Sequence, residues 1–333
     1  MPKHLRLDGA TLRAGPLAQP LEGIRRLVVV GAGKAGAGMV RAVESVLGED
    51  VLTAKHVEGI VNVPADCVEP TRAVELVAAR PAGVNEPTPE GVDATRRILD
   101  LVSGLDEDDL VLVLLSGGGS ALLTAPVPGF ALADKAELTR ELSARGASID
   151  ALNAVRREVS VVKGGGLARA SRAGRLVALI LSDVMGDDLA TIAAGPTVLG
   201  ARDPERASRV LEEFDLDATP AGARALEAMR SARQETSRDA TSITNVLIGS
   251  NATAVEAAKE AAAVLGYEVV RDDEPDGTAE ETAARLADRL QALRGRRACM
   301  ISGGEPTVRL APPEQRGLGG RNQQLALAAL QHL

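Results

Sequence analysis

Short, continuous runs of apolar residues alternate with longer amphipathic segments along almost the whole chain. Uninterrupted apolar runs are typical of strands that are buried on both faces of a parallel sheet. The segments between them carry apolar residues at helical spacing. The stretch from Thr88 to about Val102, for example, has Pro89 in its first turn and Gly104 just past its end. The pattern predicts an α/β protein with a Rossmann-like parallel sheet that has helices on both faces.

The expected elements follow from these runs in chain order. Strands are expected at 26–30, 59–63, 110–115, 176–181, 246–248, 268–270 and 298–301. Helices are expected at about 34–47, 88–102, 131–145 and 163–173. Three more are expected further on: one that begins at 252, one that ends at about 294, and one that begins at 321. The polar stretch 231–244 reads as a linker, so we expect a larger Rossmann-like domain over 1–235 and a smaller α/β domain over 243–333.

Composition narrows the classes of function. The 333 residues suffice for two domains with a core each. The formal net charge of −8 disfavours nucleic acid as a partner, because a phosphate backbone needs a basic surface. No apolar run reaches the length of a membrane span, and the start MPKHLRLDG lacks an apolar signal core. We therefore expect a soluble, cytoplasmic protein without a membrane partner. Two cysteines and three scattered histidines suggest neither a disulfide framework nor a zinc site.

The first candidate site is a glycine-rich turn, VGAGKAG, which follows a strand and opens a helix. Its glycines are Gly31, Gly33 and Gly36. They match the dinucleotide fingerprint, but the second strand ends in NVP, without the acid that would bind a ribose. Lys34, one of only six lysines, would point an ammonium group at a helix N-terminus that already favours anions. The turn therefore suits a phosphoryl group better than a nicotinamide, and a tight turn with a solvated lysine is the alternative.

The second candidate site directly follows the clearest apolar strand of the chain. It consists of Ser116, Gly117, Gly118, Gly119 and Ser120. Three glycines between two serines allow a backbone to approach a phosphate closely. Ligands of parallel α/β sheets bind at the carboxyl ends of the strands. We therefore favour a phosphate cradle here over a flexible connector.

Two later motifs of the first domain add candidate ligands. The motif NAVRREVSVVKGGG contains Asn153 and Arg156, which could bind an anionic substrate or belong to a charged surface. The motif SDVMGDD places Asp183 just past a strand end, where one or two carboxylates commonly contact Mg²⁺. Asp187 is the second candidate for the metal, and helix capping is the alternative role for it.

The last two motifs, SGGEPTV and GLGGRNQQLALA, lie in the second domain. Glu305 follows a strand there. Arg321 opens the final helix beside a glycine-rich turn, where a guanidinium could bind phosphate oxygens through two parallel hydrogen bonds. Asn322 is a candidate substrate ligand next to it. Either motif alone fits a solvated turn equally well.

Taken in order, these motifs resemble those of the class II glycerate kinases, also called the MOFRL family. The matching stretches are GAGKAG, LLSGGGSALL, NAVRREVSVVKGGGLA, SDVMGDDLATIAAGPTV, LIGSN, SGGEPTV and GLGGRNQQLALA. The resemblance spans nearly the whole chain. It implies an enzyme that phosphorylates D-glycerate to 2-phosphoglycerate with ATP and Mg²⁺, in a cleft between two α/β domains. The active-site lysine and arginine of the family fall on Lys34 and Arg321.

Some positions depart from the family pattern. The chain has Glu86-Pro87-Thr88-Pro89 where the family usually has His-Pro-x-Pro. Family members also extend further at both ends, so we expect a shortened form whose smaller domain is incomplete at its C-terminus.

Two other functions remain open at this stage. An NAD(P)-dependent hydroxypyruvate reductase is disfavoured by the missing strand-end acid and by the lack of a histidine near any motif. A non-catalytic module that binds a nucleotide or a phosphosugar would use the same glycine-rich turns. The sequence leaves open the choice between ATP and ADP, the general base (Asp183 being the leading candidate) and the oligomeric state, a homo-oligomer included.

Overall fold

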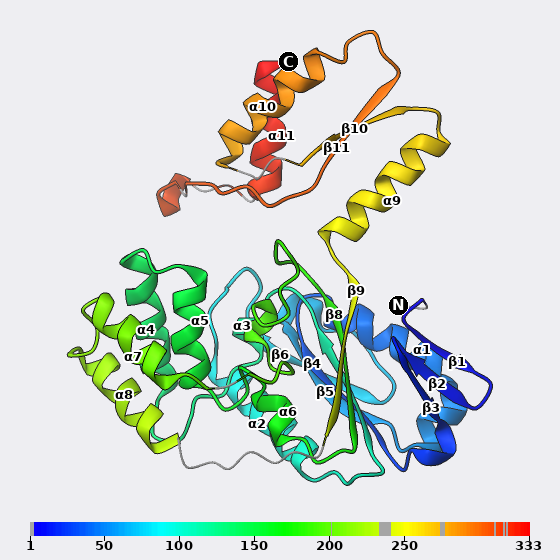
Figure 1. Cartoon of the computed structure of the whole chain (residues 1–333), viewed down its shortest axis with the longest axis vertical. Helices are drawn as coiled ribbons and strands as arrows, with labels where there is room; N and C mark the ends of the chain where they lie inside the picture. The colour runs from blue at the N-terminus through cyan, green and yellow to red at the C-terminus, as the bar shows by residue number, and fades with distance from the viewer. Residues whose placement is uncertain are drawn as a thin grey trace. The chain divides into compact units, whose positions relative to one another are not determined.

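The structure is a computed structural model that describes residues 3–200, 202–232, 241–273, 277–309, 311–315, 317 and 319–333. It contains two compact units, Met1–Ile248 and Gly249–Leu333. The larger unit is built on a sheet of six strands, and the smaller unit on a sheet of two (Figure 1). Most of the expected linker lies outside the described residues.

The six strands of the larger unit form one sheet in the order β6-β5-β4-β7-β8-β9. They are β4 (Leu27–Ala32), β5 (Glu58–Pro64), β6 (Val74–Arg80), β7 (Leu110–Leu115), β8 (Arg175–Leu181) and β9 (Ser242–Gly249). β4 pairs in parallel with β5 and β7, and β6 and β8 extend the sheet in parallel. The predicted Rossmann-like parallel α/β sheet is confirmed. β9, expected as the first strand of the second domain, lies beside β8 in this sheet.

The order of the strands places a crevice at the centre of the sheet. From β4 the chain proceeds outward through β5 to β6, and it then returns to β7 on the other side of β4. In open parallel sheets the loops after two such strands diverge to opposite faces, and ligands bind between them. The two glycine-rich turns of the sequence directly follow β4 and β7.

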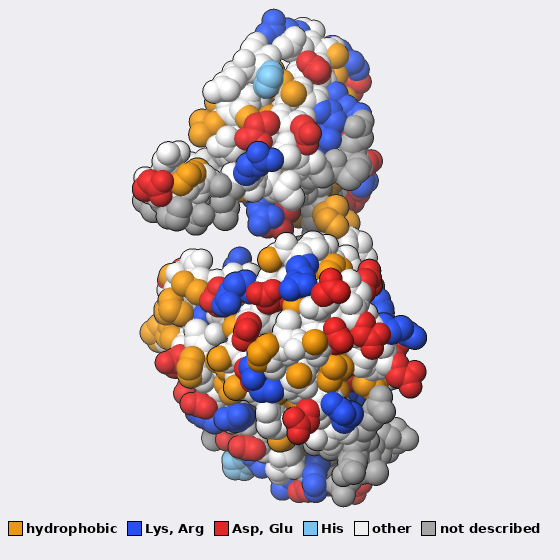
Figure 2. Space-filling view, turned by 90° about the vertical axis from the view of Figure 1, so that its left-hand side faces the viewer, with side chains coloured by type: hydrophobic (Ala, Val, Ile, Leu, Met, Phe, Trp, Pro, Cys, Tyr) orange, Lys and Arg blue, Asp and Glu red, His pale blue; other side chains and the backbone are white. Residues whose placement is uncertain are grey.

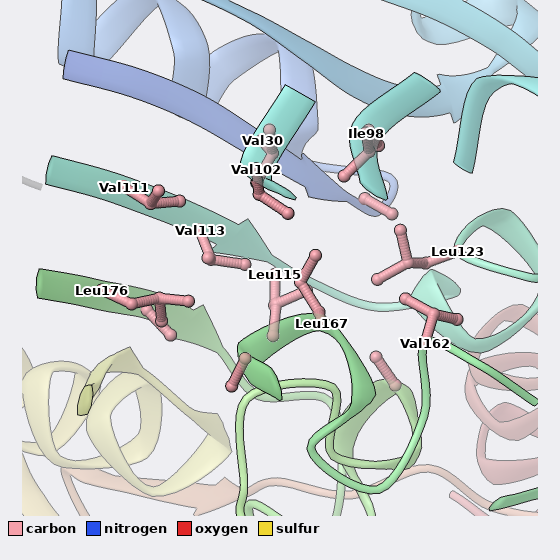
Figure 3. Packing of buried hydrophobic residues seen from close by; sticks show 14 of the residues in the cluster. Val30, Ile98, Val102, Val111, Val113, Leu115, Leu123, Val162, Leu167 and Leu176 are labelled. Atoms are coloured by element: carbon pink, nitrogen blue, oxygen red, sulfur yellow. The ribbon is translucent and has the colours of Figure 1, made fainter. Parts of the chain in front are cut away.

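Both faces of the sheet are covered. On one face, α2 (Pro89–Ser103) and α6 (Gly166–Ala170) pack on alternate residues of the strands, as Figure 3 shows. The labelled side chains of this core are Val30, Ile98, Val102, Val111, Val113, Leu115, Leu123, Val162, Leu167 and Leu176. On the other face lie α1 (Gly36–Ala54) and a small antiparallel sheet of β1 (Leu5–Asp8), β2 (Thr11–Ala14) and β3 (Leu17–Pro20). Successive residues of one strand contact opposite layers, because side chains of a strand alternate between its two faces.

A helical layer extends the larger unit beyond the sheet. It comprises α4 (Leu132–Ala144), α5 (Ile149–Glu158), α7 (Pro204–Glu213) and α8 (Pro220–Ala232), whereas the short helix α3 (Gly119–Leu122) packs on the core of the sheet. The helices α4, α5, α7 and α8 enclose a separate core around Phe130. In Figure 2, acidic and basic side chains are interspersed with single apolar ones on this side of the unit. The predicted helix 163–173 shortens to α6. It begins late, because Gly164 and Gly165 have left-handed φ values of +55° and +81°, and it ends early, because Ser171 is extended.

The smaller unit consists of α9 (Asn251–Val264), β10 (Glu268–Asp272), α10 (Ala279–Gln291), β11 (Ala298–Ser302) and α11 (Arg321–His332). β10 and β11 pair in parallel, and α10 packs against α11. Among the helices that the structure describes in either unit, none is long and apolar enough to cross a membrane.

Candidate functional site

The two glycine-rich turns are hydrogen-bonded to each other at the centre of the sheet. The Lys34 amide donates to the Gly117 carbonyl over 2.9 Å, and the Ala35 amide donates to the Ser116 hydroxyl over 3.1 Å. Ser116 is only 2% exposed. Its hydroxyl therefore joins the turns, and the surface of the loop that remains open to a ligand is formed by the residues after it.

Two cationic side chains approach Gly118. Its φ of +79° is left-handed, which favours glycine. A Cβ atom at this position would lie 3.0 Å from Arg80 Nη2 and 3.4 Å from Lys34 Cε. Lys34 is exposed, whereas Arg80 is 5% exposed. The structure thus places Lys34 beside the second glycine-rich loop, together with Arg80, which was not among the predicted ligands.

Two more cations converge on Ser120, at the other end of the same loop. Lys163 Nζ donates to the Ser120 carbonyl over 2.9 Å and to its hydroxyl over 3.0 Å. Arg156 Nη2 donates to the same hydroxyl over 2.6 Å. Asn153 is buried one turn before Arg156 on α5, so both side chains lie on one face of that helix. The predicted substrate ligand Arg156 therefore contacts the predicted phosphate loop.

The charges at this end are buried together. Lys135 donates to the Thr124 hydroxyl, and its burial, together with the charge of Arg156, lowers its pKa to about 7. Burial lowers the pKa of Lys163 far below its usual range, and nearby cations, Arg156 first, lower it further. Within the described chain, no carboxylate forms an ion pair with any of the three. Burial without a counter-charge disfavours the charged form of both lysines, and a bound anion would supply the counter-charge and favour that form.

The pKa of Lys135 has a consequence for stability. Its pKa in the unfolded chain is 10.5, against about 7 in the fold, so the native state loses this proton first as pH rises. The free energy of unfolding should therefore rise between about pH 7 and 10, by at most about 1.4 kcal/mol per pH unit. We expect Lys135→Met to be more stable than the parent protein at pH 7, and the difference to shrink towards pH 10. Urea unfolding across this range measures the effect.

The control for that experiment is Lys55→Met, at the C-terminal end of α1. It should leave the pH profile of the parent protein unchanged. A Lys135→Met profile parallel to that of the parent would show that Lys135 keeps its proton in the folded state.

The carboxylates of the motif after β8 differ in their surroundings. Asp183 lies beside the loop, with Oδ2 2.4 Å from where a Cβ atom of Gly117 would be, and it is exposed. Asp188 is occupied, because it accepts hydrogen bonds from the Ala190 amide and from the Thr191 hydroxyl. Asp187 has a φ of +54° in the tight turn between them. No group of three or more His, Cys, Asp or Glu side chains that could hold a metal ion occurs among the described residues. One free carboxylate beside a phosphate loop still fits Mg²⁺, which takes its other ligands from phosphates and water.

The remaining candidates belong to the smaller unit. Arg321 is the first residue of α11, and its Nη1 lies 3.5 Å from Glu305 Oε2. Asn322 follows in the first turn of the helix. All three side chains are exposed. Surface ion pairs of this kind contribute little to stability, which leaves Arg321 available for a ligand.

Three basic residues of the site were not among the predicted ligands. They are Arg80, Lys135 and Lys163. For Lys163, the only sequence feature that indicated a role in the site was its position inside a glycine-rich motif. Arg80 ends β6, a strand that the apolar pattern missed, because the middle of the strand is partly exposed and includes a charged residue, Glu75. Lys135 lies in α4, and nothing in its spacing distinguishes it from a solvated helical lysine.

Comparison with known proteins places this arrangement in a family. A family described as "Domain of unknown function (DUF4147)" matches residues 1–230. Human glycerate kinase is 34% identical over 360 residues, which cover 91% of this chain and 67% of that protein. A putative hydroxypyruvate reductase from Agrobacterium vitis is 36% identical over 91% of this chain and 77% of its own length. The crystal structure of a glycerate kinase from Thermotoga maritima matches with a TM-score of 0.77 and 35% identity, over 93% of this chain and 73% of that one. The chain therefore belongs to the glycerate kinase family, and residues 1–230 form its DUF4147 domain.

Proposed function

We propose that this protein transfers the terminal phosphoryl group of ATP to the 2-hydroxyl group of D-glycerate, giving 2-phosphoglycerate. The observation that carries the proposal is the set of cations around a single loop at the centre of the sheet. Lys34 lies against Gly118, and Arg156 and Lys163 contact Ser120. A phosphoryl donor and a hydroxy acid are both anionic, and such a loop can hold the two close together.

Each predicted residue has a distinct role in this scheme. Lys34 binds the transferring phosphoryl group, and the backbone of Gly117 to Gly119 cradles the phosphates, so that charge is neutralised where it develops in the transition state. Arg156 and Asn153 bind the carboxylate of glycerate. Asp183 orients the substrate hydroxyl and accepts its proton. Mg²⁺, held by Asp183 and Asp187, would neutralise phosphate charge when bound.

The other assignments extend the same proposal. Arg321 is the second phosphoryl-binding cation that the family resemblance implies, and Glu305 and Asn322 contribute to substrate binding. We also propose that the protein works in the cytoplasm. Its two cysteines, Cys67 and Cys299, are both free thiols, as is usual in a reducing compartment.

The second candidate activity is hydroxypyruvate reduction, which the name of the Agrobacterium vitis relative suggests. The turn after β4 has the glycines of a dinucleotide site. However, β5 ends in Asn62, Val63 and Pro64, and the Asn62 amide donates inward to the Leu122 carbonyl over 2.9 Å. β5 itself therefore ends without the acidic residue that binds a ribose in dinucleotide sites, and Asp66, two residues further on, lies in the short turn Ala65–Cys67. The geometry therefore favours the kinase.

The test is an assay of the purified chain with D-glycerate, ATP and Mg²⁺, in which ADP release is coupled to a colour reaction. We expect glycerate-dependent ADP release at a rate on the order of 1–100 s⁻¹, as is usual for kinases. Separation of the products should give 2-phosphoglycerate rather than 3-phosphoglycerate. NADH oxidation with hydroxypyruvate and no ADP release would support the reductase. Binding of an ATP analogue without turnover, unaffected by glycerate, would support a non-catalytic module.

A further inference from the structure

We propose that Arg80 binds the transferring phosphoryl group together with Lys34, beside Gly118. The proposal rests on the proposed function and adds a binding residue to the same site. It starts from three observations: the burial of the Arg80 side chain, its lack of partners among the described residues, and its distance from the loop.

Arg80 is buried without a counter-charge. It is the last residue of β6, and 5% of it is exposed. Its Nε is fully buried and has no hydrogen-bond partner. Within the part of the chain that the structure describes, the Arg80 side chain forms no ion pair and no hydrogen bond. Arginine is rarely buried unless it is paired, because the loss of hydration is not offset.

Nearby arginines show the ordinary arrangement. Arg72, before the start of β6, pairs with Glu49 at 2.9 Å, and Arg97 on α2 pairs with Glu75. Both are exposed. Among the described residues, these two exposed arginines therefore have carboxylate partners, whereas the buried Arg80 has none. A buried arginine with a purely structural role would be expected to have a carboxylate partner.

The guanidinium of Arg80 is directed at the phosphate loop. Its Nη2 lies 3.0 Å from the point where a Cβ of Gly118 would be, and Lys34 Cε lies 3.4 Å from the same point. Arg80 Nη2 and Lys34 Cε are therefore less than about 7 Å apart, and the Lys34 ammonium nitrogen is one bond beyond Cε. Since a hydrogen bond from a cation to an oxyanion takes up about 2.8 Å, one phosphoryl group can contact both side chains. Any side chain at position 118 would fill this space.

The charges around the loop divide into two pairs. Lys34 and Arg80 lie beside Gly118, and Arg156 and Lys163 contact Ser120. Phosphorylation of a hydroxy acid also brings together two anionic groups, the phosphoryl group and the carboxylate. Because Lys34 is the phosphoryl-binding residue, its neighbour Arg80 serves the same group. The fork of an arginine can bind two phosphoryl oxygens at once, which a second lysine cannot.

The experiment compares Arg80→Met with Arg97→Met, which removes an exposed arginine of similar length. Binding of inorganic pyrophosphate is measured by titration calorimetry at fixed salt, and steady-state kinetics are measured with both substrates. We expect Arg80→Met to weaken pyrophosphate binding at least about 10-fold and to lower kcat at least about 30-fold, with the KM for glycerate within about 3-fold. Arg97→Met should match the parent protein in every measurement.

Two further variants guard against a simple loss of folding. Arg80→Lys keeps the charge and the stem, so it should fold and recover part of the lost binding, because it cannot bind two oxygens at once. The effects of Lys34→Met and Arg80→Met should be non-additive in the double variant, since both residues contact one group. Purely additive effects would overturn the proposal, as would an unchanged affinity for pyrophosphate in either Arg80 variant.

The outcomes also separate this proposal from the proposed function. If the protein lacks glycerate kinase activity but binds pyrophosphate in a manner that depends on Arg80, the anion site stands and the activity assignment fails. If the parent protein phosphorylates glycerate but does not bind pyrophosphate, or if Arg80→Met raises only the KM for glycerate, the assignment of Arg80 to the phosphoryl group fails and the kinase stands.

Discussion

Replacing Lys34 with methionine is expected to lower kcat for glycerate phosphorylation by a factor on the order of 1,000, while the protein stays folded. Removal of one donor that stabilises a developing oxyanion costs about 100- to 1,000-fold in kcat, and removal of a phosphoryl-binding cation costs about 1,000-fold or more. The fold should tolerate the change, because the Lys34 side chain is exposed and only its amide holds the turn to Gly117. Methionine keeps the length and the backbone bond.

The matched control is Lys55→Met, a change of the same chemistry at the far end of the helix that follows Lys34. Its kcat should lie within about 2-fold of the parent value. Circular dichroism and thermal unfolding of both variants establish that the fold is intact. If Lys34→Met keeps more than about a tenth of the parent kcat, Lys34 does not take part in the reaction, and the kinase assignment loses its basis.

Replacing Gly33 with alanine is expected to destabilise the larger unit by more than about 3 kcal/mol, or to prevent its folding. A Cβ atom at this position would lie 2.0 Å from the Ser116 hydroxyl and 2.7 Å from its carbonyl oxygen. Its φ of +147° is also unfavourable for any residue with a side chain. The turn and the loop are hydrogen-bonded at this point, so neither can move without breaking the bond from the Lys34 amide to Gly117. Strain of this kind lowers the free energy of unfolding as much as the most damaging core substitutions do.

Gly38→Ala, five residues later on α1, provides the comparison. A Cβ atom there meets nothing within 4 Å, and the residue is helical and exposed. Alanine should therefore stabilise the protein by about 0.5–1 kcal/mol through its higher helix propensity. Urea unfolding of both variants measures the difference. Similar stabilities for the two would show that the turn can relax around a side chain, and that the close contact with Ser116 is not needed.

The parts of the fold that the sequence predicted best are those in which local pattern and burial agree. β7 begins and ends at the predicted residues, because both of its faces are buried and the apolar run is uninterrupted. Helix α2 is bounded by the predicted signals: Pro89 is its first residue, and Gly104 follows its last residue. Such signals act within a few residues, so a single sequence reveals them.

Other elements were missed for the same physical reason. The strands β1 to β3 and β6 each have residues in partial contact with solvent, so their apolar runs are interrupted. Their strand character comes from pairing with neighbours. The helices α5, α7 and α8 are stabilised largely by the core that they share with α4. Tertiary packing of this kind is invisible to local propensity.

For the candidate site, the sequence by itself determined that glycine-rich turns follow two buried strands, that one of them carries Lys34, and that the ordered motifs match one family. These features depend on the backbone freedom of glycine and on the order of residues along the chain. Only the tertiary structure decided which cationic side chains lie beside which residues of the loop. It brought Arg80 from β6, and Arg156 from α5, to residues 118 and 120. It also decided that Lys135 and Lys163 are buried without counter-charges. Burial and distance arise when remote segments pack together, and a lysine or arginine has the same local sequence signature whether it is solvated or held beside a phosphate.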